Sequence, residues 1–124
     1  MARLRRRLSG EGGFTLIELL VVIVIIGILL AIAVPSYLGF KDRANKAAAQ
    51  SDVRAAIPSA EAYYADNNSY AGISPAVLKA TYDSGLNLDT AKVSGAGYCL
   101  DKTVGGFPYS VTGPGGTVVA GACP

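Results

Sequence analysis

The sequence predicts an α+β protein in which one long N-terminal helix packs on a small antiparallel β-sheet. Two observations lead to this prediction. An apolar segment of membrane length runs directly into an amphipathic helical pattern, and the C-terminal part of the chain has many glycines between short β-type segments. With 124 residues, the chain has room for one small globular domain and not two.

The apolar segment covers residues 14–34 and contains a single charged side chain, Glu18. As a helix it is roughly 30 Å long, which matches the hydrocarbon core of a bilayer. This segment explains why the mean hydropathy of the chain, +0.37, is high for a small domain. The sequence therefore predicts a basic head, a membrane-length helix and a globular remainder.

Charge is unevenly divided along the chain. Four arginines and Glu11 give residues 1–13 a net charge of +3, whereas the seven basic and eight acidic side chains after Gly13 give −1. An arginine cluster directly before an apolar helix favours retention of the N-terminus in the cytoplasm. A nucleic-acid patch is the alternative, but it requires the arginines to lie on the folded domain.

Three common kinds of segment compete to explain the apolar helix. A secretory signal peptide fits the basic start and the small residues of Ala31-Ile32-Ala33, but its apolar core is usually only about 7–15 residues long. A plain membrane anchor is disfavoured by Glu18, because a carboxylate at membrane depth costs about 2.5–3.5 kcal/mol and usually marks function. A soluble buried helix is disfavoured by the length of the unbroken apolar run.

The residues around Glu18 closely resemble the N-terminal motif of the type IV prepilin family. In that family a short basic leader ends in glycine, phenylalanine often follows, and a glutamate lies four positions further on. Here these residues are Gly13, Phe14 and Glu18. The resemblance implies that a membrane-embedded prepilin peptidase cuts after Gly13 and methylates the new amino group of Phe14.

The same resemblance implies the partners and the location of the chain. The precursor spans the membrane once with its N-terminus in the cytoplasm, and the mature form lies in an extracellular pilus. Its partners are further copies of itself in a helical filament, the prepilin peptidase, a membrane platform protein and a cytoplasmic ATPase.

Cleavage after Gly13 gives Glu18 a role. The new amino terminus at Phe14 is a positive charge in apolar surroundings, and Glu18 of a second subunit can pair with it. Burying either charge alone costs free energy, and pairing offsets part of that cost only when the subunits are correctly staggered. Glu18 is therefore predicted to set the subunit register, more for specificity than for net stability.

Two further residues of the apolar helix match the family, Gly27 and Pro35. Proline removes a backbone donor and clashes with the carbonyl four residues earlier, here that of Ala31. The residues predict a bend near Pro35, and the resemblance implies local extension between Gly27 and Pro35 on assembly.

The expected domain organisation has three parts: a removable leader at 1–13, a transmembrane and filament-core helix at 14–35, and a globular pilin head at 36–124. Within the head we expect an amphipathic helix at 36–66, a loop and short helix at 67–91, and a β-meander at 92–124. The apolar spacing of 4, 3 and 4 predicts that one helix face packs on the core through Val53, Ile57, Ala60 and Tyr64. Pro58 is expected to kink or split this helix.

Turn and cap signals divide the rest of the head. Ser74 and Pro75 predict the cap and first residue of a short helix that runs to about Tyr82. Strands are predicted at 97–103, 107–112 and 117–120, with a turn at 113–116 between the last two. Pro108 either places its strand at a sheet edge or marks the strand's start.

The two cysteines, Cys99 and Cys123, are predicted to form a disulfide, because an even count in an exported domain favours a bridge over metal binding or catalysis. Such a crosslink contributes roughly 3–4 kcal/mol in the chain-entropy account. Many pilins close their C-terminal region in this way, so the resemblance agrees.

No enzyme activity, cofactor or metal is predicted. The chain has no histidine, which removes Ser/His and Cys/His catalysis. Asp83, Asp89 and Asp101 are separated and lack the alternating spacing of a calcium loop. Some secretion pseudopilins use a C-terminal calcium site in place of a disulfide. The tyrosines along the helix are expected to pack in the core.

The predicted function is that of a structural pilus subunit for adhesion, motility or related surface functions. A pseudopilin of a type II secretion system shares the N-terminal chemistry, but the cysteine pair and the missing acidic cluster favour the pilus. A minor pilin of a DNA-uptake pilus would carry a basic, aromatic-rich head, whereas the composition after Gly13 is slightly acidic. Nucleic acid is therefore not expected as a main partner.

Overall fold

The computed structural model describes residues 14–124, so the predicted leader at 1–13 lies outside the described residues. The chain divides into two compact units, one that ends at Gly39 and one that covers Phe40–Pro124. Helix α2, Leu16–Asn67, contributes to both units. Among the described residues, the first unit consists of the N-terminal part of this helix and the two residues before it.

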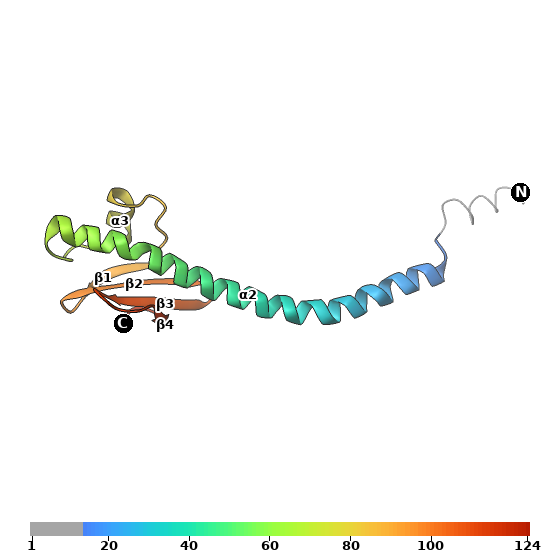
Figure 1. The fold of residues 1–124 in the computed structure, drawn as a ribbon. Helices are drawn as coiled ribbons and strands as arrows, with labels where there is room; N and C mark the ends of the chain where they lie inside the picture. The colour runs from blue at the N-terminus through green and yellow to red at the C-terminus, as the bar shows by residue number, and fades with distance from the viewer. Residues whose placement is uncertain (1–13) are drawn as a thin grey trace, which may run out of the picture. The chain divides into compact units, whose positions relative to one another are not determined.

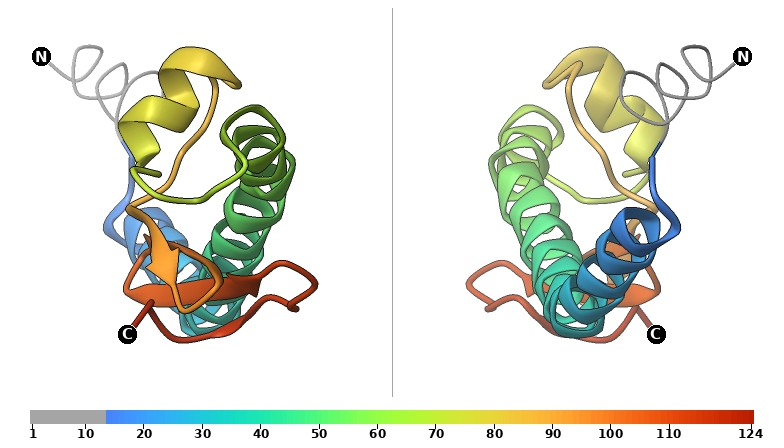
Figure 2. Two further views of the ribbon diagram at one scale, coloured as in Figure 1. Left: turned by 90° about the vertical axis from the view of Figure 1, so that its left-hand side faces the viewer. Right: turned by 90° about the vertical axis from the view of Figure 1, so that its right-hand side faces the viewer.

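The second unit combines the C-terminal part of α2 with a short helix and a sheet. Its further elements are α3 (Pro75–Thr81), β1 (Thr90–Ser94), β2 (Gly97–Val104), β3 (Phe107–Gly113) and β4 (Val119–Ala120). The strands form an antiparallel meander in the order β1-β2-β3-β4. The sheet lies below α2 and α3 lies above it (Figure 1), and the turned views in Figure 2 again show α3 at the top and the sheet at the bottom. The predicted α+β architecture is confirmed.

Local sequence signals account for the boundaries of these elements. The Ser74 hydroxyl accepts a hydrogen bond from the backbone N–H of Val77 at 3.2 Å, which caps α3 as predicted. The β2–β3 hairpin turns at Gly105 and Gly106, both with positive φ, as a tight two-residue turn of type I′ requires.

The core of the second unit forms where α2 meets the sheet. The buried apolar residues of α2 repeat at spacings of 4, 3, 4 and 3, and three of these five residues are alanines, with the buried polar Ser59 beside them. The five apolar residues are Ala49, Val53, Ala56, Ala60 and Tyr63. Across from them lie the buried side chains of Tyr98, Leu100 and Val111 from the sheet and of Leu78 from α3.

The buried face of α2 differs from the predicted one in part. Val53 and Ala60 are fully buried as predicted, and Ile57 is partly buried. Tyr64 is 41% exposed, whereas its neighbour Tyr63 is only 8% exposed and belongs to the core. The prediction followed the large apolar side chains, while the helix buries a face defined by small alanines.

The sheet also departs from the predicted one. Strand β1 was not predicted, because Thr90–Ser94 contains a lysine and only two strongly β-forming residues, and it is paired along its whole length with β2. Pro108 is the second residue of β3, which lies between β2 and β4, so the edge assignment is wrong and the strand start is correct. Helix α2 is not split at Pro58 or at Pro35, and the bend near Pro35 stays a prediction.

Candidate functional site

Helix α2 begins with a reciprocal pair of hydrogen bonds between Thr15 and Glu18. The backbone N–H of Thr15 donates to Glu18 Oε2 at 3.2 Å, and the backbone N–H of Glu18 donates to Thr15 Oγ1 at 3.2 Å. This is a capping box, in which two otherwise unpaired donors of the first turn are satisfied by side chains. The carboxylate of Glu18 is thereby held at the N-terminal end of the helix, against the backbone N–H of Thr15, the residue that follows Phe14.

The helical segment that follows Glu18 exposes an almost continuous apolar surface. The large apolar side chains from Phe14 to Leu38 are 46–85% exposed. Among the described residues, α2 is the one helix long and apolar enough to cross a membrane, by length and composition. A contiguous apolar surface of this size is characteristic of contact with lipid or with other protein chains.

Gly27 and Pro35 lie inside this apolar helix. A side chain at Gly27 would meet no atom within 4 Å, so nothing in this subunit requires a glycine there. One residue after Pro35, the hydroxyl of Ser36 donates a hydrogen bond to the carbonyl of Ile32 at 3.4 Å. This bond adds a side-chain contact in the turn where proline has removed a backbone donor.

The last six residues, 119–124, form a segment that we call the C-terminal strap. Cys99 and Asp101 alternate with the core residue Leu100 along β2, so they lie on the opposite face of the sheet. They are nevertheless buried, at 0% and 6% exposure. The strap covers them through the Cys99–Cys123 disulfide, which confirms the predicted bridge, and through a 2.8 Å hydrogen bond from the Cys123 N–H to Asp101 Oδ2.

Two further contacts hold the strap. The backbone N–H of Gly121 donates to the carbonyl of Pro108 at 2.9 Å, and the ammonium group of Lys92 donates to the carbonyl of Pro124. Lys92 pairs with Cys99 across β1 and β2, so both contact the strap from adjacent strands. The strap therefore spans the outer face of three strands.

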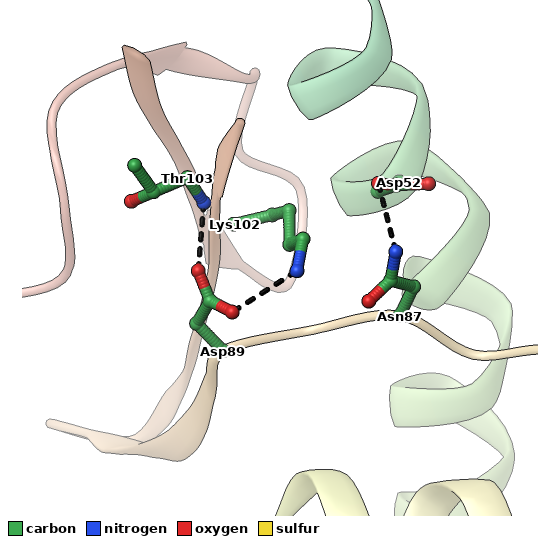
Figure 3. Close-up of polar contacts among 5 residues, drawn as sticks. All are labelled: Asp52, Asn87, Asp89, Lys102 and Thr103. Atoms are coloured by element: carbon green, nitrogen blue, oxygen red, sulfur yellow. Dashed lines mark hydrogen bonds and ion pairs between the residues drawn. The ribbon is translucent and has the colours of Figure 1, made fainter. Parts of the chain in front are cut away.

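The three aspartates considered as metal ligands each hold a local structure. Asp83 accepts a hydrogen bond from the Gly85 N–H at 2.9 Å, and Asp101 holds the strap. Asp89 accepts from the Thr103 N–H at 2.8 Å and pairs with the Lys102 ammonium at 3.1 Å (Figure 3). Within residues 14–124, no three potential ligands lie close enough to hold a metal ion.

The bonds to Asp89 also set its acidity. Its pKa lies below the ordinary value mainly because the Thr103 N–H stabilises the carboxylate; partial burial opposes this lowering, and the hydrogen bond and charge of Lys102 add to it. A second contact in Figure 3, from the Asn87 amide to Asp52 at 3.5 Å, links the same loop to α2.

A cluster of tyrosines around Glu61 was not predicted from the sequence. The hydroxyls of Tyr98 and Tyr70 donate to the two oxygens of Glu61, at 3.0 and 3.4 Å. The rings of Tyr70 and Tyr98 lie 4.9 Å apart, and Tyr64 stacks on Tyr70 at 4.7 Å. Burial, and then the neighbouring carboxylate, raise the pKa of Tyr98 and Tyr70 above the usual value. The hydrogen bonds to Glu61 join α2, the loop after it and β2. Residue spacing in the sequence does not reveal these contacts.

The N-terminal segment of the chain is similar to a known protein family. Residues 8–34 match a family model described as a prokaryotic N-terminal methylation motif. This range includes the predicted cleavage position at Gly13, which lies outside the described residues, together with Phe14, Glu18 and Gly27.

Longer similarities extend into the head. The chain is 35% identical over 116 residues to the type II secretion system core protein G of Aeromonas hydrophila, covering 85% of this chain and 75% of that protein. It is 38% identical over 92 residues to the type IV wide pilus major component PilA4 of Thermus thermophilus, covering 71% and 70%. Similarity to the type IV major pilin PilA of Myxococcus xanthus is 38% over 58 residues, covering 47% of this chain and 26% of that one. No solved structure matches the chain.

The long apolar helix, the small antiparallel sheet and the methylation motif together define a filament-forming structural subunit with a membrane-anchored precursor. The chain belongs to the type IV pilin family, which is the family shared by the pilins and the secretion core protein above. Family membership indicates assembly into a filament of many subunits. Both pili and secretion systems are represented among the relatives.

Proposed function

We propose that this chain is a structural subunit of a type IV pilus, assembled from the membrane into a surface filament for adhesion, motility or related surface functions. The observation that carries the proposal is the C-terminal strap. It is closed by the Cys99–Cys123 disulfide, and the buried acid beneath it, Asp101, is engaged by the Cys123 N–H. A disulfide-closed head is suited to an oxidising extracellular location.

Processing is the first step of the proposed pathway. A prepilin peptidase cuts after Gly13 and methylates the amino group of Phe14, and a platform protein and a cytoplasmic ATPase then extract the subunit from the membrane. Extraction from the membrane requires work, because moving a large apolar side chain from an apolar environment into water costs a free energy of about 1.5–3 kcal/mol. With the large apolar side chains of residues 14–38 at 46–85% exposure, this part of the helix leaves lipid only for another apolar environment, the filament core.

Glu18 sets the subunit register in this proposal. The capping box already holds its carboxylate at the N-terminal end of α2, where the positive end of the helix dipole favours a negative charge. On assembly, the carboxylate pairs with the positive amino terminus of Phe14 on a neighbouring subunit. The pairing offsets the cost of burying both charges only at one stagger, so it selects that stagger.

Gly27 and Pro35 provide the proposed flexibility of the helix during assembly. The open space around Gly27 leaves room for close approach by a neighbouring chain. Proline and glycine both weaken a helix, and local extension between them lets the subunits adjust their contacts along the core.

A pseudopilin of a type II secretion system is the second candidate. The specific observation in its favour is the 35% identity to core protein G of Aeromonas hydrophila, which extends over 85% of this chain. The two candidates share the N-terminal chemistry and differ in whether the filament reaches the cell surface.

The first experiment is to shear filaments from intact cells, purify them and determine the N-terminal residue of this protein by mass spectrometry. Recovery in the filaments with methylated Phe14 at the N-terminus supports both the processing and the pilus role. The same processed chain found only in membranes supports the pseudopilin. A chain that starts at Val34 would show ordinary signal cleavage and would overturn the proposal.

A further inference from the structure

A pocket of about 320 Å³ lies in the head, between the C-terminal end of α2 and the β1–β2 hairpin. Nine residues line it, from two segments, 64–71 and 93–97. Both segments lie at the left end of the head in Figure 1. All nine belong to the second unit, and none belongs to the C-terminal strap. The volume is at the lower end of the range for small-molecule sites.

The lining of the pocket is aromatic and polar, and none of its described residues carries a formal charge. Tyr64 and Tyr70 contribute rings, Asn68 an amide and Ser69 a hydroxyl, while the hairpin contributes small residues around Gly95. Such a lining offers no ion pair to a charged ligand. It offers aromatic surface and neutral hydrogen-bonding groups side by side.

Three of the lining residues have unused hydrogen-bonding capacity. Within the described part of the chain, the hydroxyl of Tyr64 and the side-chain amide of Asn68 form no hydrogen bond, and the Ser69 hydroxyl only accepts one, from the Ala71 N–H at 3.0 Å. An amide has donors and an acceptor, and a hydroxyl can do both. A ligand rich in hydroxyl groups matches this combination.

The pocket wall is held in place before any ligand binds. Tyr64 stacks on Tyr70 at 4.7 Å, and Tyr70 is fixed in turn by Tyr98 and Glu61. Asn68 adopts a positive φ of 54°, and its N–H donates to the carbonyl of Tyr64 at 2.7 Å. A preformed wall lowers the entropy cost of binding.

We propose that this pocket binds a neutral saccharide unit. The C–H face of a pyranose ring packs on the exposed ring of Tyr64, whose negative face attracts the weakly positive C–H groups. Its hydroxyls bond to Asn68, Ser69 and the Tyr64 hydroxyl. The uncharged lining favours a neutral sugar over an acidic one, because a buried charge without a partner costs free energy.

The inference does not depend on the choice between pilus and secretion filament, because the pocket belongs to the subunit itself. Saccharide binding by the subunit with no recovery in surface filaments would support this site and contradict the pilus role. Recovery of the subunit in surface filaments without saccharide binding would support the pilus role and contradict this site.

The test uses the full chain in micelles of lauryldimethylamine oxide, a detergent without a sugar headgroup. Saturation-transfer difference NMR is recorded with lactose, cellobiose and N,N′-diacetylchitobiose as probes. We expect transfer to the C–H protons of at least one disaccharide, and roughly tenfold weaker binding in Tyr64→Ser. The matched control is Tyr37→Ser, which removes an exposed tyrosine of the first compact unit and leaves binding unchanged.

A second variant distinguishes loss of the binding site from loss of folding. Ala96→Phe places a large ring in the pocket from the exposed hairpin and is expected to block binding with an unchanged melting temperature. The absence of transfer to all three probes in the wild type, or equal transfer in the wild type, Tyr64→Ser and Ala96→Phe, would overturn the proposal.

Discussion

At the scale of single residues, acidic side chains in the head join segments that are distant in sequence. Glu61 receives the hydroxyls of two tyrosines, Asp89 joins the loop before β1 to the end of β2, and Asp101 receives the strap. Hydrogen bonds to charged groups contribute more to stability than neutral ones. The acidic residues of the head are therefore used as structural acceptors.

Tyr98→Phe tests the contribution of Glu61. The variant keeps the buried ring but removes the 3.0 Å hydrogen bond to the carboxylate, and we expect the free energy of unfolding to fall by about 1–2 kcal/mol. Thermal unfolding followed by near-UV circular dichroism measures the change. The control is Tyr64→Phe, whose hydroxyl has no partner in the described part of the chain, and which should unfold like the wild type.

Asp89→Asn tests the effect of pH. The pKa of Asp89 in the folded state lies below the unfolded value of 3.8, so its ionised form stabilises the fold above that value and the contribution is lost as pH falls through the folded pKa. The variant should be less stable at pH 7, by less than about 1 kcal/mol because Asp89 is partly exposed. The difference from the wild type should shrink as the pH falls below the unfolded value of 3.8. An unchanged difference at both pH values would contradict this assignment.

At the scale of elements, the interface between α2 and the sheet depends on small side chains. Ala49, Ala56 and Ala60 are completely buried, and close-packed interiors do not accept added volume without strain. The buried face of α2 therefore has no room for larger side chains at these three positions.

Ala56→Leu is expected to lower the free energy of unfolding by about 1–3 kcal/mol through overpacking. The adjacent Ala55 is exposed, so Ala55→Leu adds the same atoms without entering the core and should leave the stability of the isolated subunit nearly unchanged. Chemical denaturation of both variants in micelles distinguishes them. Equal destabilisation would show that added bulk, and not the buried face, is responsible.

The strap gives a second prediction at this scale. Reduction of Cys99–Cys123, or its replacement in Cys99→Ala/Cys123→Ala, should cost about 3–4 kcal/mol of stability. Dithiothreitol should lower the melting temperature of the wild type and leave that of the double variant unchanged, which is the internal control. Opening of the disulfide can be checked separately by counting free thiols. If the disulfide is open and the melting temperature of the wild type does not change, the stabilising role is contradicted.

Some elements of the head were predicted from local sequence signals, whereas others depend on contacts between separate segments and were not predicted. Ser74 and Pro75 identified α3, and the glycines of the turns identified β2 and β3, because caps and turns are encoded by adjacent residues. Strand β1 depends on pairing with residues of β2 that lie 3 to 11 positions away, and the Glu61 cluster depends on tyrosines 9 and 37 positions away. Spacing along the chain does not reveal such contacts.

At the scale of the whole molecule, the N-terminal segment carries the clearest signal in the sequence, because charge, glycine and apolar length coincide there. The family model for the methylation motif confirms the resemblance, while cleavage after Gly13 and the register role of Glu18 stay predictions. The capping box of Thr15 was overlooked, although its pattern of threonine followed three residues later by glutamate is visible in the sequence.

Glu18→Ala should leave membrane insertion intact and reduce filament yield, because it removes the charge that we propose selects the stagger between subunits. It also removes the capping box, so Thr15→Ala is the matched control: it weakens the cap and keeps the carboxylate. Quantification of sheared filaments and of the membrane fraction separates the two effects. Normal yield from Glu18→Ala, or equal loss in both variants, would contradict the register role.

The strap has a further consequence for a protein that is concentrated in a membrane and then in a polymer. Strand β4 satisfies backbone groups of Tyr109 and Ser110 that β3 would otherwise present at the edge of the sheet. Exposed strand edges invite pairing between molecules and uncontrolled aggregation. By fastening a two-residue strand over that edge with a covalent bond, the head discourages a β-type polymer and leaves the helices to direct association.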